Sequence, residues 1–238
     1  MKKNKKIIAI IPARGGSKRL PVKNIKKLLG KPLIAWTIEQ AKKSKYIDRL
    51  IVSTDDKKIA EISKKYGAEI VKRPKKLATD KAKTIDAVSH LLEILEKEKY
   101  IPEIVVLLQP TSPLRTEKDI DETIKLFLRK KVESVVSVCE VEHPPYWYFK
   151  INSRGFLEPF IKSQYLYKRH QDVPKVYRVN GAVYIANPKT LYKYKSFYCK
   201  KTLPYLMSSE RSIDIDNEID FKLAELILKK NEKDKNRK

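Results

Sequence analysis

Residues 7–24, IIAIIPARGGSKRLPVKN, decide the fold class of this chain. The run 7–11 is entirely apolar and has the length of a strand, which is typical of a strand buried on both faces. A polar loop with two adjacent glycines follows over 13–24, and Pro32 then opens an amphipathic helical pattern. A buried strand, a glycine-containing loop and a helix in this order predict the first βα unit of an α/β sheet.

The same alternation continues along most of the chain and favours a mostly parallel mixed sheet flanked by helices. We predict strands at 7–11, 50–53, 69–71, 104–108, 134–138 and 179–186, and helices from Pro32, after 54–56, from about Thr84, over 120–128 and over 221–228. Beyond Val141 the pattern changes to dense aromatics and short strand-like pieces, which indicates an insertion over 141–175. The α/β domain then comprises 1–140 and 176–230, and the lysine-rich 231–238 is predicted to be a disordered basic tail.

Composition limits the classes of protein to which this chain can belong. Its 238 residues are 42% hydrophobic and 34% charged, which suits one α/β domain with a small appendage. No run approaches the apolar length of a membrane span, and the basic N-terminus lacks the cleavage pattern of a signal peptide. Two cysteines exclude a disulfide framework and disfavour a cysteine-based zinc site. We therefore expect a cytoplasmic protein with no membrane partner.

An excess of positive charge is the strongest compositional feature. The chain has 53 Lys and Arg against 29 Asp and Glu, which gives a formal net charge of +24. Such a charge favours acidic partners, either nucleic acid or phosphorylated small molecules. Much of the excess falls on predicted helix faces and in the tail, and charge-rich surfaces also occur in proteins that work at high temperature. We therefore expect no nucleic-acid partner and keep nucleic-acid binding as the alternative.

The first candidate site is the loop after the strand 7–11, because ligands of open α/β sheets bind beyond the carboxyl ends of the strands. It combines Gly15 and Gly16 with the cations Arg14, Lys18, Arg19 and Lys23. Small residues let backbone N–H groups approach an anion, and the cations neutralise phosphate charge. The spacing matches neither a P-loop nor a dinucleotide fingerprint. We interpret this loop as a triphosphate site; a basic surface turn is the structural alternative.

Two segments follow other predicted strands. In QPTSPLR, residues 109–115, two prolines stiffen the loop and hold Gln109 at the sheet edge, where its amide can bind a base or a sugar hydroxyl. In the same region Ser112 or Thr116 is placed to cap the next helix. YRVNGAVYIAN, residues 177–187, offers Arg178 for an acid and the Asn-Gly pair for a tight turn or a close approach to a ligand.

A third segment, SIDIDNEID, carries paired carboxylates. Alternation along residues 212–220 places Asp214 and Asp216 on one face of an extended piece, with Ile213 and Ile215 turned to the core. Mg²⁺ is typically bound by one or two carboxylates together with substrate phosphates, so the pair suits that ion. An ion pair with a nearby lysine explains the same two residues without a metal.

Six motifs in order resemble those of the acylneuraminate cytidylyltransferases, the CMP-sialic acid synthetases. They are ARGGSKRLPVKN (13–24), STDD (53–56), RPKKLATD (73–80), LLQPTSPLR (107–115), RVNGAVYI (178–185) and SIDIDNEID (212–220). The resemblance implies a Rossmann-like nucleotide-diphospho-sugar transferase fold and a homodimer formed through the insertion. It also implies an enzyme that joins CTP to a nonulosonic acid, in which the anomeric hydroxyl attacks the α-phosphorus and pyrophosphate leaves.

The resemblance further implies roles for individual residues. The phosphates of CTP would bind Arg14, Gly15, Ser17, Lys18, Lys23 and Asn24, and the cytosine and ribose would lie near Arg73 and Thr84. The sugar would contact Gln109, Thr111 and Tyr184, with Phe197 and Tyr198 forming part of an apolar pocket. Asp214 and Asp216 would hold Mg²⁺, the one cofactor expected. The catalytic set would be Arg14, Lys18 and these two aspartates.

One segment departs from the family pattern. Where some members carry a lysine that meets the carboxylate of the sugar, EHPPYWYF (142–149) has Trp147 and no cation. We expect Arg169, His170 or Arg178 to take that place, from the same subunit or its partner. Neuraminate-, legionaminate- and pseudaminate-type acids all stay open as substrates. The close alternative is a sugar-1-phosphate nucleotidyltransferase, which would share the basic loop.

Overall fold

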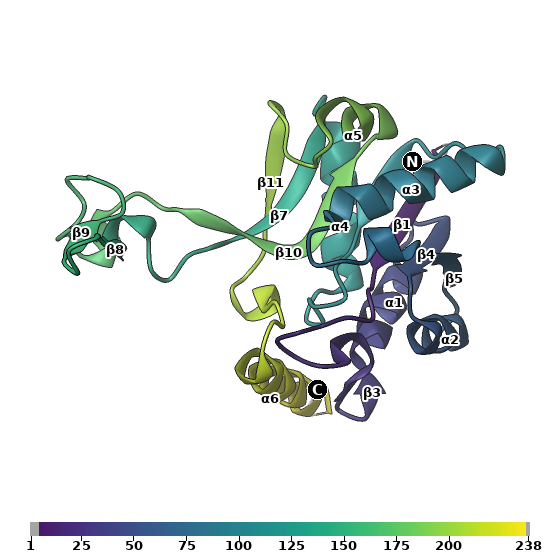
Figure 1. Cartoon of the computed structure of the whole chain (residues 1–238), viewed down its shortest axis with the longest axis horizontal. Coiled ribbons are helices and arrows are strands. Elements are labelled where there is room, and N and C mark those ends of the chain that lie inside the picture. Colours follow the sequence, from purple (N-terminus) through teal and green to yellow (C-terminus); the bar gives the residue numbers. More distant parts are fainter. Residues whose placement is uncertain (1–4, 237–238) are drawn as a thin grey trace.

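The computed structural model describes residues 5–236 and contains a seven-stranded mixed sheet with helices on both faces (Figure 1). The strand order is β11-β7-β10-β6-β1-β4-β5. β1 lies parallel to β4 and β6, β4 to β5, and β7 to β11, whereas β10 is antiparallel to both neighbours. The strands are β1 (Ile7–Pro12), β4 (Arg49–Thr54), β5 (Glu69–Lys72), β6 (Ile104–Leu107), β7 (Ser134–Glu140), β10 (Tyr177–Ala186) and β11 (Thr202–Leu206).

Six α-helices accompany the sheet in the described part of the chain: α1 (Leu33–Lys43), α2 (Lys57–Lys65), α3 (Thr84–Lys97), α4 (Glu117–Arg129), α5 (Pro188–Tyr194) and α6 (Glu218–Asn236). Two small hairpins, β2 (Lys27–Leu28) with β3 (Lys31–Pro32) and β8 (Phe149–Ile151) with β9 (Leu157–Pro159), lie outside the main sheet. Pro32 directly precedes α1, and Thr116 caps α4 by accepting a hydrogen bond from the backbone N–H of Asp119. None of the helices in residues 5–236 is long and apolar enough to cross a lipid bilayer.

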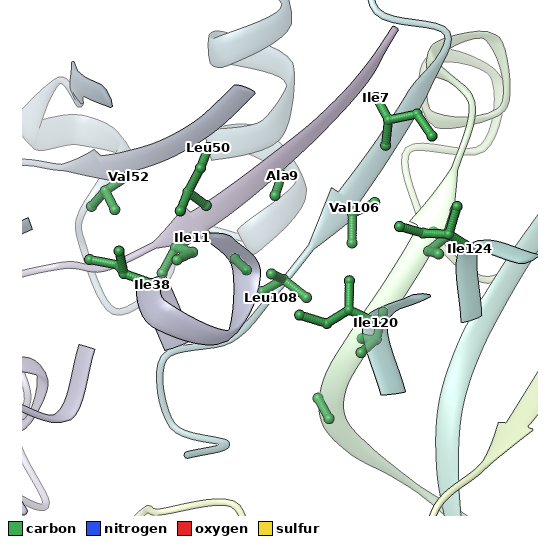
Figure 2. Packing of buried hydrophobic residues seen from close by; sticks show 14 of the residues in the cluster. Ile7, Ala9, Ile11, Ile38, Leu50, Val52, Val106, Leu108, Ile120 and Ile124 are labelled. Atoms are coloured by element: carbon green, nitrogen blue, oxygen red, sulfur yellow. The ribbon is translucent and has the colours of Figure 1, made fainter. Parts of the chain in front are cut away.

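β1 is buried on both faces, as its uninterrupted apolar sequence predicts. Ile7, Ala9 and Ile11 pack into a cluster with residues of α1 and α4, such as Ile38 and Ile120 (Figure 2). The alternate residues of β1 pack on the opposite face, against α3 and α5. Because successive side chains of a strand point to opposite faces, β1 contributes to the apolar clusters on both faces of the sheet. This burial on both faces is typical of a central strand.

A third apolar cluster lies outside these two layers. It contains Leu20, Leu28, Leu33 and Leu114 together with Ile215, Phe221, Ala224 and Leu228. The first group belongs largely to the loop after β1 and the elements that follow it, and the second to the segment before α6 and to α6 itself. Figure 1 shows the result, with α6 beside the β2–β3 hairpin. Burial of this cluster brings the C-terminal segment to the loop after β1.

Between β7 and β10 the chain leaves the sheet and forms an arm, which carries the β8–β9 hairpin away from the body (Figure 1). Val141 donates a backbone hydrogen bond to Val176 and closes the base of the arm. The arm, residues 141–175, exposes large apolar side chains, among them Ile151 and Leu157, whose exposed fractions are 72% and 69%.

The structure corrects three expectations about the elements. β11 and α5 form regular elements where the sequence pattern predicts none. α6 is longer than predicted and continues through residues 231–236, so this part of the expected disordered tail is helical; residues 237 and 238 lie outside the described residues. Lys, Glu and Asn at the end of α6 are compatible with a solvated helix, and the i,i+4 pair between Lys229 and Glu225 supports it.

Candidate active site

A cavity of about 640 Å³ lies beyond the carboxyl ends of β1, β5 and β6, where an open α/β sheet binds its ligands. Eleven of the predicted site residues line it: Arg14, Ser17, Lys18, Lys23, Asn24, Arg73, Thr84, Gln109, Thr111, Asp214 and Asp216. The lining holds six cationic side chains and three carboxylates. This excess of positive charge suits a ligand that carries several negative charges.

The loop after β1 is held in place by two buried or half-buried side chains. Asn24 is buried and donates from Nδ2 to the carbonyl of Arg14, 2.9 Å away. Lys23 donates from Nζ to the carbonyl of Ile215 at 2.7 Å and to Oδ1 of Asp216 at 3.1 Å. Arg14 and Lys18 thus project from a loop whose backbone is fixed by Asn24, and Lys23 connects that loop to the C-terminal segment.

The acidic segment and the basic loop meet at one place although they are 197 residues apart in sequence. Arg19 donates from Nη1 to Oδ2 of Asp216 at 3.1 Å, whereas Lys23 contacts the other oxygen of this carboxylate. The backbone N–H of Ile215 donates to the carbonyl of Thr111 at 2.8 Å, which ties the same segment to the loop after β6. Three loops from distant parts of the chain therefore form one site.

At the other end of the cavity, Arg73 is buried directly after β5. It donates from Nε to Oγ of Ser53 at 3.1 Å and from Nη2 to the carbonyl of Ser53 at 2.6 Å. Burial lowers the pKa of Arg73, and the positive charge of Arg14 acts in the same direction, whereas Asp55 opposes both. Thr84, the first residue of α3, lies on the same wall.

Asp214 and Asp216 have different surroundings. Burial raises the pKa of Asp214, a hydrogen bond from Thr111 opposes this, and Asp216 raises it further. Oδ1 of Asp214 is buried and has no hydrogen-bond partner among the described residues, whereas Asp216 is half exposed and contacts Lys23 and Arg19. An unpartnered buried carboxylate oxygen fits a cation ligand. The described residues contain no group of three or more His, Cys, Asp or Glu that could hold a metal ion by themselves, so substrate oxygens would have to complete the shell.

Some predicted site residues lie apart from the cavity. The N–H of Gly15 donates to Oδ1 of Asp55 at 3.1 Å, and a Cβ on Gly15 would lie only 2.9 Å from Oδ2 of Asp56. The glycine therefore allows close packing against residues after β4. Its contact with phosphate stays a prediction. Arg169 is in the arm, paired with Asp172 at 2.8 Å.

Phe197 and Tyr198, predicted to form part of an apolar pocket, form a cluster with Tyr184, and none of the three lines the cavity. The ring of Tyr184 lies 5.7 Å from that of Phe197 and 6.3 Å from that of Tyr198. Tyr184 and Phe197 are buried, and Tyr198 is exposed. Burial raises the pKa of Tyr184, with contributions from Tyr198 and Asp214. Arg178 lies close by; it donates to the carbonyl of Ser212 at 3.1 Å instead of lining the cavity.

Comparison with known proteins gives the family. The model of the family described as "Cytidylyltransferase" matches residues 8–233. The chain belongs to this cytidylyltransferase family. It is 41% identical over 229 residues to the CMP-N,N'-diacetyllegionaminic acid synthase of Legionella pneumophila, covering 95% of this chain and 98% of that protein.

Other members of the cytidylyltransferase family show different lengths and substrates. The N-acylneuraminate cytidylyltransferase of Escherichia coli is 40% identical over 231 residues, which are 97% of this chain but 54% of that protein, so the chain spans about half the length of this relative. The pseudaminic acid cytidylyltransferase of Campylobacter jejuni is 34% identical over 227 residues, covering 95% and 97% of the two chains.

The fold agrees with the family. The solved structure of CMP:2-keto-3-deoxy-manno-octonic acid synthetase complexed with CTP matches with a TM-score of 0.72 at 17% identity, over 95% of this chain and 99% of that one. A 4-diphosphocytidyl-2C-methyl-D-erythritol synthase from Anaerococcus prevotii matches with a TM-score of 0.66 at 19% identity, over 94% and 99%. These likenesses confirm the Rossmann-like nucleotidyltransferase fold expected from the sequence.

Asp80 also lines the cavity, although its sequence motif predicts no role for it. Its carboxylate pairs with Arg14 at 2.9 Å and with Lys18 at 2.6 Å, the two cations that we assign to phosphate. The hydrogen bond from Lys18 holds the pKa of Asp80 below its usual value. The motif RPKKLATD contains this residue, but nothing in its spacing shows that its loop folds back over the loop after β1. In this structure, the carboxylate of Asp80 is the anionic partner of both cations.

A triphosphate that binds Arg14 and Lys18 must displace Asp80, so Asp80→Asn is expected to lower the KM for CTP by about two- to fivefold, the range set by an exposed ion pair. Initial rates at varied CTP would measure this change. Glu122→Gln, which breaks an exposed ion pair with Lys125 on α4, is the matched control and should leave the KM for CTP unchanged. A higher KM in Asp80→Asn would mean that Asp80 assists binding of the nucleotide.

Proposed function

We propose that this chain catalyses the transfer of CMP from CTP to a nonulosonic acid, with release of pyrophosphate. The observation that carries the proposal is the contact of the loop after β1 with the aspartate segment, through Asp216 with Lys23 and Arg19, inside one cationic cavity. Membership of the cytidylyltransferase family supports CTP as the nucleotide. The names of the Legionella, Escherichia and Campylobacter relatives support a nonulosonic acid as the acceptor.

The side chains of the cavity supply the charge and the positioning that phosphoryl transfer requires. Arg14, Lys18 and Lys23 lie where they can neutralise the triphosphate, and Asn24 keeps the backbone that presents them fixed. Arg73 and Thr84 form the wall assigned to the nucleoside. At the opposite end, Gln109 and Thr111 are positioned to orient the sugar toward the α-phosphorus.

Asp214 and Asp216 are the residues that would hold Mg²⁺. The buried, unpartnered Oδ1 of Asp214 supports this assignment, and Asp216 stands beside it with cationic neighbours. When bound, the ion would neutralise phosphate charge and increase the acidity of a hydroxyl that it contacts. Lys23 bridges Asp216 and the carbonyl of Ile215, so it fixes the segment that presents both carboxylates.

The function is tested by pyrophosphate release. CTP is combined with N-acetylneuraminic, legionaminic or pseudaminic acid, and each reaction is repeated with ATP, GTP or UTP and with sugar 1-phosphates. Product with CTP and a free nonulosonic acid alone supports the proposal, and the best acid identifies the substrate. Turnover restricted to sugar 1-phosphates would replace it with a sugar-1-phosphate nucleotidyltransferase. No turnover together with salt-dependent DNA or RNA binding would favour a nucleic-acid-binding protein.

We also propose that the arm joins two copies of the chain into a homodimer. Large apolar side chains are exposed over its whole length: Tyr148, Phe149, Ile151, Phe156, Leu157, Phe160, Ile161 and Tyr167. Such a concentration on one projecting element is typical of an interface between proteins. The arm also carries Arg169 and His170, which in a dimer would be available to the partner's site as counter-charges for the sugar carboxylate.

Replacement of one exposed arm residue is expected to separate the two copies. Ile151→Asp introduces a carboxylate into the exposed apolar surface of the arm. A dimer formed through this surface would bury that charge without a partner, which is unfavourable. Light scattering coupled to size-exclusion chromatography should give a dimer mass for the wild type and a monomer mass for this variant at micromolar concentration. Leu226→Asp, at a similarly exposed position on α6, should stay dimeric. A monomeric wild type would contradict the proposal.

A further inference from the structure

Arg115 is a buried charged residue beside the candidate site, and no role has yet been given to it. It ends the QPTSPLR loop, its exposed fraction is 1%, and it is among the largest fully buried side chains of the described residues. Nε and Nη2 have no hydrogen-bond partner there. Burial lowers the pKa of Arg115 to about 9, with Asp119 opposing this effect, so the guanidinium is still charged at neutral pH.

One nitrogen of Arg115, Nη1, donates to two backbone carbonyls, one in the loop after β6 and one in β10. Nη1 donates to the carbonyl of Gln109 at 3.2 Å and to the carbonyl of Ala182 at 2.8 Å. Gln109 follows β6, and Ala182 lies in β10 within an irregularity of the β7–β10 pairing between Val179 and Tyr184. Arg115 thus fixes the separation of two neighbouring backbones at a place where the regular ladder is interrupted.

Burial of an arginine with two unpartnered nitrogens lowers the stability of a fold. Its charge must leave water, and only part of its hydrogen-bonding capacity is used in return. Its acidic neighbour, Asp119, is also engaged elsewhere: it accepts hydrogen bonds from Thr116 and forms an ion pair with Arg211 at 3.3 Å. A well-packed apolar side chain would fill the same space at lower cost, which indicates that the two carbonyl contacts matter for another reason.

The backbones that Arg115 connects determine where the amide of Gln109 lies. Gly181, with φ +76°, is the residue before Ala182, and a Cβ at Gly181 would lie 2.6 Å from Oε1 of Gln109 and 3.5 Å from Oδ2 of Asp214. The amide of Gln109 therefore rests against the bare Cα of Gly181, next to Asp214. A small change in the separation of residues 109 and 182 would move this amide relative to the carboxylate.

We propose that Arg115 is a positioning residue for the acceptor sugar: it fixes the carbonyls of Gln109 and Ala182 so that the Gln109 amide is seated on Gly181 beside Asp214. This inference rests on the proposed function, since it concerns the sugar half of that reaction. The nucleotide half, formed by the loop after β1 and by Arg73, is held by separate hydrogen bonds. The two halves should therefore respond differently when Arg115 is replaced.

Arg115→Met nearly keeps the volume of the side chain and removes both hydrogen bonds that Nη1 makes. We expect the KM for the nonulosonic acid to rise by about tenfold, with the KM for CTP unchanged within about twofold, because a charged hydrogen bond is worth about a factor of ten or more. Arg115→Lys, which can still present one nitrogen to the carbonyls, should recover part of the loss. Gly181→Ala leaves Arg115 intact but displaces Gln109, so it should raise the same KM.

The controls separate positioning from stability. Arg49→Met removes another arginine, whose ion pairs with Glu69 and Glu98 lie outside the cavity, and it should change neither KM. If Arg115→Met and Gly181→Ala act on the same amide, the double variant should lose less than the product of the single losses. Isothermal titration of CTP and of the sugar acid checks the same split at equilibrium.

Two different failures can be told apart. A folded wild type without turnover on any nonulosonic acid would overturn the proposed function, and this inference with it. If the wild type is active but Arg115→Met raises the KM for CTP and the KM for the sugar acid equally, or changes neither, only the inference is overturned. If Arg115→Met does not fold, Gly181→Ala and Arg115→Lys decide the matter, and an unchanged sugar KM in both would overturn the proposal.

Discussion

Asp216→Ala is expected to lower turnover by about a thousandfold while the protein stays folded. The proposed bound metal ion stabilises charge in the transition state by several kcal/mol, and about 1.4 kcal/mol corresponds to a factor of ten. Asp216 is half exposed and packs into none of the three apolar clusters, so the fold does not depend on it. Steady-state rates at increasing Mg²⁺, together with the melting temperature, measure both parts of the prediction.

Glu218→Ala is the matched control for this variant. Glu218 is a carboxylate on the same segment and is likewise paired with a lysine, Lys26, at 2.6 Å, but it does not line the cavity. Its removal should leave the rate close to that of the wild type. If Asp216→Ala instead keeps an undiminished Mg²⁺-dependent rate, Asp216 is not a metal ligand and its contacts with Lys23 and Arg19 are structural.

The second large effect is expected from Arg14→Ala, which should raise the KM for CTP by about 10- to 100-fold, the loss expected for a charge-assisted hydrogen bond to phosphate. The carbonyl of Arg14, which accepts the hydrogen bond of Asn24, is retained in the variant, so the loop should keep its conformation. The KM for the sugar acid should change little. Kinetics at varied CTP, with direct titration of CTP, measure the effect.

Arg129→Ala is the matched control, because it also removes one positive charge. Arg129 lies at the exposed end of α4 and does not line the cavity. It should leave the KM for CTP unchanged at fixed ionic strength. Equal losses in the two variants would mean that the overall charge of the protein, and not a specific phosphate contact, attracts the nucleotide. Equal KM values in the wild type and Arg14→Ala would remove Arg14 from the phosphate site.

The parts of the fold that the sequence predicts are those with strong periodicity. The strand 7–11 is apolar at every position because both of its faces are buried, and that signal is unambiguous. β11 is different: it contains Pro204, and it pairs only at the edge of the sheet, where a proline is tolerated. α5 is short and rich in lysine and tyrosine, so its apolar face is too small to give a helical period.

The site shows a similar division. Motifs with several cations or carboxylates identify the loop after β1 and the aspartate segment, and the structure brings them together. Asp80 and Arg115 escape prediction because their contacts are with partners in other parts of the chain: Arg14 for the aspartate, and two backbone carbonyls for the arginine. The spacing of residues within one motif cannot predict contacts with residues from another part of the chain.

The third apolar cluster has a consequence for biosynthesis. The ribosome makes the loop after β1 early, whereas Asp214, Asp216 and the helix that anchors them follow nearly two hundred residues later. A nascent chain can therefore pair the strands of the central sheet well before it can assemble a working nucleotide pocket. Under the proposed function, polypeptides released before residue 214 would lack both carboxylates and could not transfer CMP.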